Sequence, residues 1–228
     1  KNTLTLSLLS LILGFPLQII LALLLNEASN GHFRKTFQTV SYAPHFISTV
    51  VMCGMLTLFL NPTSGIFNII ITKLGGESVN FLQDPANFKW IYVLSAVWQE
   101  MGWGSIIYFA TLSGVDRSLL EAAEIDGANR FQKIWYINVP VLIPTIIILL
   151  ILQCGSLLSV GYEKVYLLQN TTNLSGSEVI STYVYKVGLE QADFSFGAAA
   201  DLFNSVINST ILILANFIAK RTTDQGLF

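Results

Sequence analysis

The sequence predicts an all-α membrane protein, a bundle of helices that cross the bilayer several times. Hydrophobic residues make up 53% of the 228 residues and charged residues only 11%, less than half of the share of about a quarter that is usual in soluble domains. The apolar stretches are continuous and lack the alternation expected of strands in a membrane barrel. The net charge of -2 leaves no positive excess for a phosphate backbone, so nucleic acid is not an expected partner.

Five apolar segments are long enough to cross a bilayer, which takes about 20 helical residues. Pro16, Pro44 and Pro144 are expected to kink these helices or to mark their ends. Cys53 and Cys154 lie inside apolar runs and far from each other in sequence, so we expect small apolar side chains there and neither a disulfide nor a metal site. The segments are 3–25, 41–60, 90–112, 139–160 and 196–219.

The connections between these segments alternate in charge, and positive residues tend to stay in the cytoplasm. Residues 26–39, 113–138 and the C-terminal tail hold seven Lys and Arg residues, whereas the opposite set holds five. We therefore expect one membrane domain over residues 1–228, a cytoplasmic loop at 113–138, a cytoplasmic C-terminus and Lys1 outside. With no signal peptide pattern, a first residue outside leads us to expect a further upstream span and at least six in the complete protein.

Two outer connections have local patterns of their own. The apolar stretch 65–74 is bounded by glycines and suits a short helix at the membrane interface, or equally a re-entrant or packed loop. Residues 170–177, rich in Thr, Asn, Ser and Gly, predict an exposed turn.

The loop 113–138 has the most specific pattern in the chain, and it predicts two short helices joined by a hinge. Asp116 and Ser118 are suitable N-caps for a helix over 119–125. Asp126-Gly127 would end it, because glycine adopts the left-handed conformation of a helix C-terminus. A second helix from Asn129 would run into the fourth span, with Pro140 and Pro144 at its entry. Such a rigid helix suits docking into a groove of a partner, where Ala122 and Ala123 allow close approach and Glu121 offers a carboxylate.

This loop resembles the cytoplasmic signature of permease subunits of ATP-binding-cassette importers, which reads EAA, three residues, G, nine residues, I, one residue, LP. Val139 stands where that family usually has Leu. The stretches 41–50, 103–108 and 161–168 resemble the complex-carbohydrate branch, which imports oligosaccharides such as aldouronates, and the resemblance covers nearly the whole chain. The residues that match are Glu121, Ala122, Ala123, Gly127, Ile137 and Pro140.

The resemblance implies a type I importer permease in the cytoplasmic membrane of a bacterium. It implies a second permease subunit, forming a heterodimer, together with two cytoplasmic ATPase subunits and an extracytoplasmic solute-binding protein. The loop would be the coupling helix, seated in the ATPase. The residues expected at that contact are Glu121, Ala122, Ala123, Asp126, Gly127, Ile137 and Pro140.

ATP and Mg are expected in the partner ATPase subunits, and no cofactor is expected in this chain. It has no GxxxxGK[ST] phosphate loop, since no glycine is followed by lysine. Neither HExxH nor GxSxG occurs, so an enzyme is the weakest hypothesis.

Polar side chains at membrane depth are the candidates for a translocation path, because each is costly against lipid. Glu100 is flanked by tryptophans that could stack on sugar rings while Gln99 or Glu100 binds hydroxyls. In the last span Asp201, Asn204, Ser205 and Asn208 share one helical face, and Gln153 with Ser156 lies in the fourth. Packing and helix-to-helix hydrogen bonds explain each group equally well. The path candidates are Trp98, Gln99, Glu100, Trp103, Gln153, Asn204 and Asn208.

Two alternatives stay open. The chain could belong to an importer of another solute, such as glycerol phosphate or a peptide. It could also be an ion- or proton-coupled transporter with Glu100 as a relay, although such a transporter has no use for the docking loop. For Glu124, Arg117 and Arg130 a solvated helix surface is expected.

Overall fold

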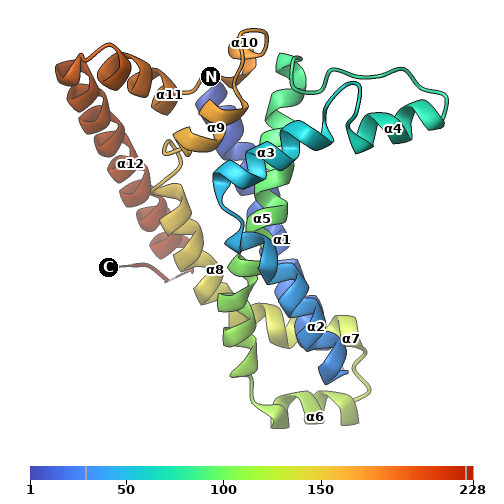
Figure 1. The fold of residues 1–228 in the computed structure, drawn as a ribbon. Helices are drawn as coiled ribbons and strands as arrows, with labels where there is room; N and C mark the ends of the chain where they lie inside the picture. Colours follow the sequence, from blue (N-terminus) through green and yellow to red (C-terminus); the bar gives the residue numbers. More distant parts are fainter. Residues whose placement is uncertain (29, 224, 228) are drawn as a thin grey trace. The chain divides into compact units, whose positions relative to one another are not determined.

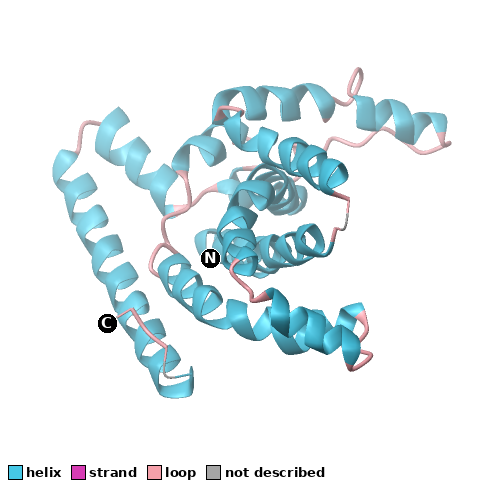
Figure 2. Cartoon of the chain, turned by 90° about the horizontal axis from the view of Figure 1, so that it is seen from below, coloured by secondary structure: helices cyan, strands magenta, loops and turns pink. Residues whose placement is uncertain are grey.

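The computed structural model describes residues 1–28, 30–223 and 225–227, so Ser29 of the first predicted connection lies outside the described residues. Helices and connecting loops make up these ranges, and no strand occurs in them (Figures 1 and 2). The predicted all-α class is confirmed. The helices are α1 (Asn2–Glu27), α2 (Gly31–Tyr42), the 3-10 turn η1 (Ala43–Phe46), α3 (Thr49–Phe59), α4 (Ile66–Lys73), α5 (Pro85–Ser113), α6 (Arg117–Ile125), α7 (Arg130–Lys133), the π-helical turn η2 (Ile134–Asn138), α8 (Val139–Cys154), α9 (Tyr162–Leu168), α10 (Leu174–Ser177), α11 (Ile180–Tyr185), the π-helical turn η3 (Lys186–Glu190) and α12 (Phe194–Thr223).

Fewer helices than the predicted five are long and apolar enough to cross a membrane. Three in the described ranges qualify, Asn2–Glu27, Arg130–Cys154 and Phe194–Thr223, and a broken pair could add a fourth. The predicted third span forms α5, whose 29 residues are long enough to cross. Polar and aromatic residues around Glu100 lower its mean hydropathy, so its crossing stays a prediction.

The second predicted span, 41–60, is wrong as a single helix. The chain forms α2 and η1 up to Phe46 and begins a new helix, α3, at Thr49. Ser48 is extended, with φ -63° and ψ 150°, and its hydroxyl accepts a hydrogen bond from the Val51 N–H at 3.4 Å. This N-cap starts α3 afresh, and Pro44 in η1 has no N–H for a helical ladder.

Two further predictions about span ends need correction. The fourth helix runs without a break from Arg130 to Cys154, which confirms the predicted helix from Asn129 into the fourth span, but it ends six residues before the predicted end at Val160. The fifth, α12, extends the predicted 196–219 at both ends.

The helix predicted at residues 65–74 is confirmed as α4. Its buried residue is polar: the Asn68 side chain donates to the carbonyls of Asn61 and Val79 and accepts from the Val79 N–H. Ile66, Phe67, Ile69 and Ile70 are exposed within the chain. Placement at the membrane interface stays a prediction.

The chain divides into two compact units. Unit 1 comprises Lys1–Ser10, Ile47–Ala96 and Leu157–Asn208, and unit 2 comprises Leu11–Phe46, Val97–Ser156 and Ser209–Phe228. In unit 1, α9 packs against both α3 and α11. Their buried side chains include Met52, Cys53 and Val165, so Cys53 is the small buried residue expected from sequence.

In unit 2 a buried cluster holds α1, α5 and α8 together. It is formed by Ala22, Tyr108, Leu112 and Leu142. Phe15 meets the Tyr108 ring edge-on, with centroids 6.2 Å apart. Within this unit α6 and α7 lie between α5 and α8 along the chain and at the lower end of the view (Figure 1), and most side chains of α6 are exposed.

Candidate functional site: the α6–α7 loop and the polar pockets

The first helix of the loop starts as the sequence predicts. Asp116 is the N-cap of α6, and its carboxylate accepts the Ser118 N–H at 2.9 Å. Hydrogen bonds from the backbone and the hydroxyl of Ser118 hold the pKa of the Asp116 carboxyl below its ordinary value. Ser118 is therefore the donor to the cap, and the cap itself is Asp116 alone.

The hinge after α6 is a complete Schellman motif, which explains the spacing between the alanines and the glycine. The N–H of Ala128 donates to the Ala123 carbonyl at 2.8 Å, and the N–H of Gly127 donates to the Glu124 carbonyl at 3.0 Å. These are the two bonds of that motif, and they need a left-handed residue at the position of Gly127. Gly127 has φ +79°, while Asp126 is the C-cap.

The second helix of the loop begins with its own cap. Asn129 and Gln132 form a capping box, in which each side chain accepts the other's backbone N–H, at 2.9 and 2.7 Å. The two helices are joined by an ion pair between Lys133 Nζ and Glu124 Oε1 at 2.6 Å. Lys133 holds the pKa of the Glu124 carboxyl below its ordinary value by this hydrogen bond and by charge. Glu124 is exposed, as expected, but it is paired with Lys133, a partner that the sequence reasoning missed.

The loop joins its transmembrane helix through the π-helical turn η2, which contains Ile137. Asn138, the last residue of η2, is fully buried and its amide donates to Glu27 Oε1 at 3.3 Å. Pro140 follows in the first turn of α8, where its missing N–H is tolerated. Turns of π-helix concentrate at functional sites, and here one connects the loop to a membrane helix.

The outer surface of the loop is suited to docking. Glu121 and Ala122 are exposed on α6, whereas Ala123 is half-buried. Large apolar side chains are also exposed nearby, which marks an interaction surface. Sequence reasoning missed these side chains, although the spacing of Phe131 and Trp135 places them on one helical face. They are Ile125 (88% exposed), Phe131 (83%), Tyr136 (75%) and Trp135 (68%).

A second site lies in a pocket of about 400 Å³ in unit 2. It brings together four residues that the sequence singled out: Glu100 and Trp103 from α5, Gln153 from the last turn of α8, and Ser156 just after that helix. Gln18 of α1 also lines it. The remaining lining residues are Phe15, Gly104, Ile107, Tyr108, Leu149 and Leu152. Polar groups among apolar walls give this pocket the chemistry of a site for a small polar ligand.

His45 holds the charged end of this pocket in place, and sequence reasoning gave it no role. Its Nδ1 lies 2.9 Å from Glu100 Oε2, and its ring stacks on Trp103 at 4.4 Å with 3° between the planes. Phe46 meets the same tryptophan edge-on at 5.7 Å. No sequence signal joins His45 to a residue 55 positions away, because the contact depends on tertiary packing.

Other path candidates do not join this pocket. Trp98 is half-exposed and Gln99 is buried, and neither lines it. Asn208, in unit 1, accepts the Leu158 N–H at 3.1 Å and donates to Ser159 Oγ at 2.9 Å, so it fastens the chain after α8. Asn204 is half-buried and does not line the unit 1 pockets.

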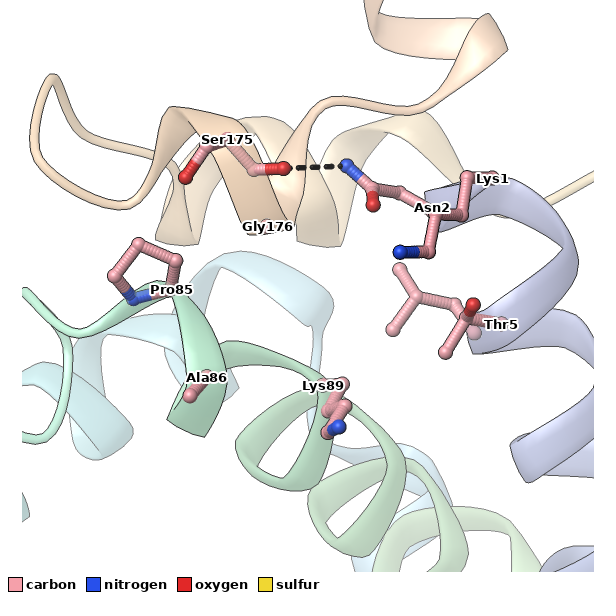
Figure 3. A pocket seen from close by; sticks show the side chains of 9 residues that line it. Lys1, Asn2, Thr5, Pro85, Ala86, Lys89, Ser175 and Gly176 are labelled. Carbon is pink, nitrogen blue, oxygen red and sulfur yellow. Dashed lines mark hydrogen bonds between the residues drawn. The ribbon is translucent and has the colours of Figure 1, made fainter.

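A further pocket, of about 280 Å³ in unit 1, is cationic (Figure 3). Lys1 and Lys89 both line it, and the Asn2 amide closes one side by donating to the carbonyls of Ser175 and Glu178, each at 3.0 Å. Sequence reasoning did not anticipate this pocket.

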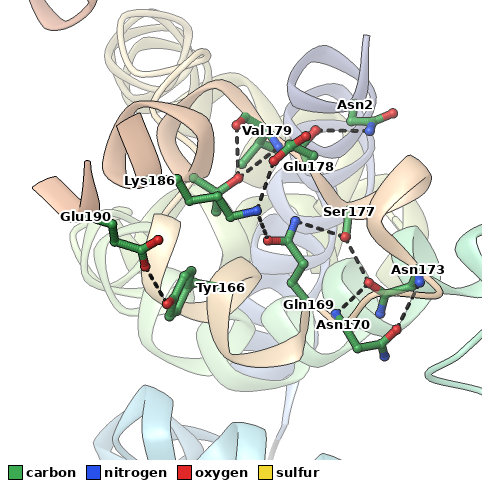
Figure 4. Close-up of polar contacts among 11 residues, drawn as sticks. Asn2, Tyr166, Gln169, Asn170, Asn173, Ser177, Glu178, Val179, Lys186 and Glu190 are labelled. Carbon is green, nitrogen blue, oxygen red and sulfur yellow. Dashed lines mark hydrogen bonds and ion pairs between the residues drawn. The ribbon is translucent and has the colours of Figure 1, made fainter. Parts of the chain in front are cut away.

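The segment predicted as an exposed turn, 170–177, does turn at residues 171–173 and is partly exposed, and buried hydrogen bonds also hold it (Figure 4). Asn173 and Ser177 are fully buried and bonded to each other at 2.9 Å. Lys186 Nζ donates to Gln169 Oε1 at 2.7 Å and to Glu178 Oε1 at 2.9 Å. Asparagine and serine side chains here form the hydrogen bonds that backbone groups would form in a helix or a sheet.

Comparison with known proteins identifies the kind of protein that carries this loop. Residues 4–224 match the family described as "Binding-protein-dependent transport system inner membrane component". In Bacillus subtilis (strain 168), protein LplB is 41% identical, and the polygalacturonan/rhamnogalacturonan transport system permease protein YteP is 42% identical. Each alignment covers 100% of this chain, with 72% of LplB and 71% of YteP.

The fold is similar to that of a chain in the crystal structure of a bacterial alginate ABC transporter in complex with an alginate pentasaccharide-bound periplasmic protein. The TM-score is 0.96 and the sequence identity 42%, over 100% of this chain and 79% of that chain.

Proposed function

The chain belongs to the family of inner membrane components of binding-protein-dependent transport systems, and from this premise we propose how it works as a permease of an ATP-driven importer. It forms the path for an oligosaccharide across the membrane. Its α6–α7 loop transmits the closure of cytoplasmic ATPase subunits to the spans. The observation that carries this proposal is the exposed, doubly capped loop with the Glu121-Ala122-Ala123 face and the Gly127 hinge.

Coupling by this loop depends on its rigidity. A docked helix transmits the movement of the ATPase only if the hinge beside it keeps its conformation. The Schellman motif at Gly127 and the Glu124–Lys133 ion pair hold α6 and α7 together as one rigid unit. Glu121 offers a carboxylate to an Arg or Lys of the ATPase, and the exposed Phe131 and Trp135 offer apolar anchors. Asp126, the C-cap of α6, belongs to the contact with the ATPase. Ile137 in η2 and Pro140 in the first turn of α8 transmit the movement of the loop to the transmembrane helix.

The assembly has four further protein components. Two ATPase subunits bind ATP and Mg and dock on the cytoplasmic side, where the C-terminus of this chain also lies. A second, related permease subunit completes a heterodimeric path, and an extracytoplasmic solute-binding protein delivers the substrate. The exposure of α12, of whose most apolar stretch only 11% is buried within the chain, supports a neighbouring subunit or lipid along it.

The proposed substrate is an oligosaccharide, and the pocket in unit 2 is its proposed site. The stacked His45–Trp103 pair presents a flat aromatic surface, while Glu100, Gln153 and Gln18 offer hydrogen-bond partners for hydroxyls. The relative whose name specifies polygalacturonan and rhamnogalacturonan, and the structure that contains alginate, support the carbohydrate class.

Transport by the reconstituted complex tests this function. We expect uptake of one oligosaccharide class into proteoliposomes that requires ATP and the binding protein and survives an uncoupler of the proton gradient. Glycerol phosphate and a tripeptide serve as competing solutes, and uptake of either in preference to every oligosaccharide contradicts the substrate class.

The proton-coupled alternative is favoured by one observation, the His45–Glu100 pair at 2.9 Å, which could pass a proton. Uptake that an uncoupler abolishes, with no associated ATPase, would support that alternative and contradict the importer.

A further inference from the structure

A pocket of about 380 Å³ in unit 1 is distinct from the coupling loop and from the substrate pocket proposed above. It lies among α9, α11, η3 and the first turns of α12. Its size is at the lower end of the range for small-ligand sites, about 300–1,000 Å³. Most of its lining is apolar, and the groups suited to specific binding are the rings of Tyr162 and Tyr185 and the carboxylate of Asp201.

The tyrosine rings of this pocket are fixed by one another. Tyr162 and Tyr185 stack with centroids 5.1 Å apart and 19° between their planes, and Tyr166 meets Tyr185 edge-on at 5.2 Å. The Tyr166 hydroxyl donates to Glu190 Oε1 at 2.7 Å (Figure 4). Because the rings are already ordered, a ligand that stacks on them incurs little cost in side-chain entropy.

The backbone around the pocket is unusual in three respects. The turn η3 is π-helical, and Ala192, just after it, has φ +60°, a conformation that residues with a side chain rarely adopt. A Cβ on Gly188 would lie 3.2 Å from the Gly197 Cα, so the pair of glycines lets η3 lie against α12. Turns of π-helix and left-handed residues concentrate at functional sites, where binding requires a special backbone.

Asp201, which is exposed within the chain, gives the pocket a charge on a helix where charge is costly against lipid. It lies in the third turn of α12, a helix long and apolar enough to cross a membrane, and the nearest charged residue after it in that helix is Lys220. An ionisable residue in such a helix is expected to face the protein or a wet cavity and to have a function. Asp201 lines this pocket, where its carboxylate is an acceptor for the hydroxyls of a ligand.

We propose that this pocket binds one neutral sugar ring of the transported oligosaccharide, with the ring's apolar face on Tyr162 or Tyr185 and its hydroxyls on Asp201. The proposal rests on the proposed function, since it takes an oligosaccharide as the cargo. A pyranose combines an apolar face with a rim of hydroxyl donors, and the pocket combines an aromatic surface with a carboxylate acceptor. The same carboxylate repels the carboxylate of a uronate, so the pocket selects neutral residues.

Photolabelling of the assembled importer in lipid nanodiscs tests this site directly. The probe is maltotriose that carries an alkyl diazirine, and the labelled peptides are identified by mass spectrometry. We expect labelling between residues 180 and 201, displaced by maltotriose more readily than by trigalacturonate. Tyr185→Leu and Asp201→Asn should each weaken this labelling about three- to tenfold, the effect of losing one ring contact or one charged acceptor.

A matched control separates the pocket from the general fold. Tyr183 lies on the same helix and is 50% exposed, but it packs on Phe196 and does not line the pocket. Tyr183→Leu should leave the labelling unchanged, and Tyr185→Phe, which keeps the ring, should also retain it. Equal losses in Tyr183→Leu and Tyr185→Leu would overturn the proposal.

Two other outcomes also overturn it. One is the absence of labelling in this segment of the wild type. The other is labelling of the segment by a diazirine-bearing fatty acid that maltotriose does not displace, because the pocket would then hold lipid. ATPase stimulation by the binding protein is measured on the same preparations. If stimulation is present without labelling, this proposal alone fails, whereas no associated ATPase means that the proposed function fails.

Discussion

Replacement of Gly127 is the most informative perturbation of the coupling loop, because only the backbone conformation is altered. No atom beyond the glycine and its two chain neighbours lies within 4 Å of where a Cβ would stand, so a side chain would meet no other part of the protein. The cost comes from φ +79°, which is about 1–2 kcal/mol for a residue with an ordinary side chain and more for a β-branched one. Asparagine tolerates this conformation well.

These numbers predict an order among three variants. Gly127→Asn should couple nearly as well as the wild type, Gly127→Ala less well, and Gly127→Val least. A cost of about 1–2 kcal/mol lowers the fraction of loops with the native hinge roughly 5- to 30-fold relative to the opened form, and a partner that binds only the native hinge loses affinity by up to that factor. ATPase stimulation by the loaded binding protein, measured against ATPase concentration, reports the loss.

Hydrogen exchange gives an independent measurement on the same variants. The Ala128 amide, which donates to Ala123 at 2.8 Å, should exchange faster in Gly127→Val than in Gly127→Asn. If all three variants couple alike, or if the asparagine variant is as defective as the valine variant, then the left-handed hinge does not carry the coupling.

Three further predictions concern other contacts. Lys133 depresses the pKa of Glu124, so their ion pair stabilises the loop above the ordinary carboxyl pKa and is lost as pH falls through the lowered value. The hydrogen-exchange protection factors of the α6 amides, which correct for the pH dependence of intrinsic exchange, should therefore fall as pH falls through that range. Lys133→Met should remove this dependence, and a dependence that persists in the variant would contradict the assignment. Glu100→Gln should reduce oligosaccharide uptake without dissociating the ATPase, whereas reduced expression with normal specific uptake would show a structural role for the His45–Glu100 pair. Asn208→Ala removes two hydrogen bonds from a buried amide and should lower the unfolding free energy by about 1–3 kcal/mol, seen as a lower Tm of the detergent-solubilised complex; an unchanged Tm would refute this role.

The parts of this protein that could be predicted from sequence are those fixed by local interactions. The caps at Asp116 and Asn129 and the hinge at Gly127 each depend on residues within a few positions, and the structure has all of them. The prediction of one continuous span over 41–60 failed because mean hydropathy is insensitive to a single N-cap residue, Ser48, within an apolar run.

Contacts between distant residues could not be predicted. His45 and Glu100 carry no pattern that pairs them, and the burial of Asn173 depends on a bond to the Leu82 carbonyl at 2.8 Å, 91 residues away. Asn208 lies on the polar face that the sequence predicts for α12. Periodicity alone does not show which residue of such a face lines a pocket and which, like Asn208, forms hydrogen bonds with a neighbouring loop.

The most direct test of the central claim is the ATPase activity of the co-expressed complex in proteoliposomes, with and without the binding protein and a panel of oligosaccharides. If the α6–α7 loop couples the ATPase to the spans, one oligosaccharide class should stimulate ATP hydrolysis in the wild type and in Gly127→Asn, and this stimulation should be lost in Gly127→Val. A wild-type complex with no associated ATPase, or a valine variant stimulated as strongly as the wild type, would show that the loop does not couple the two.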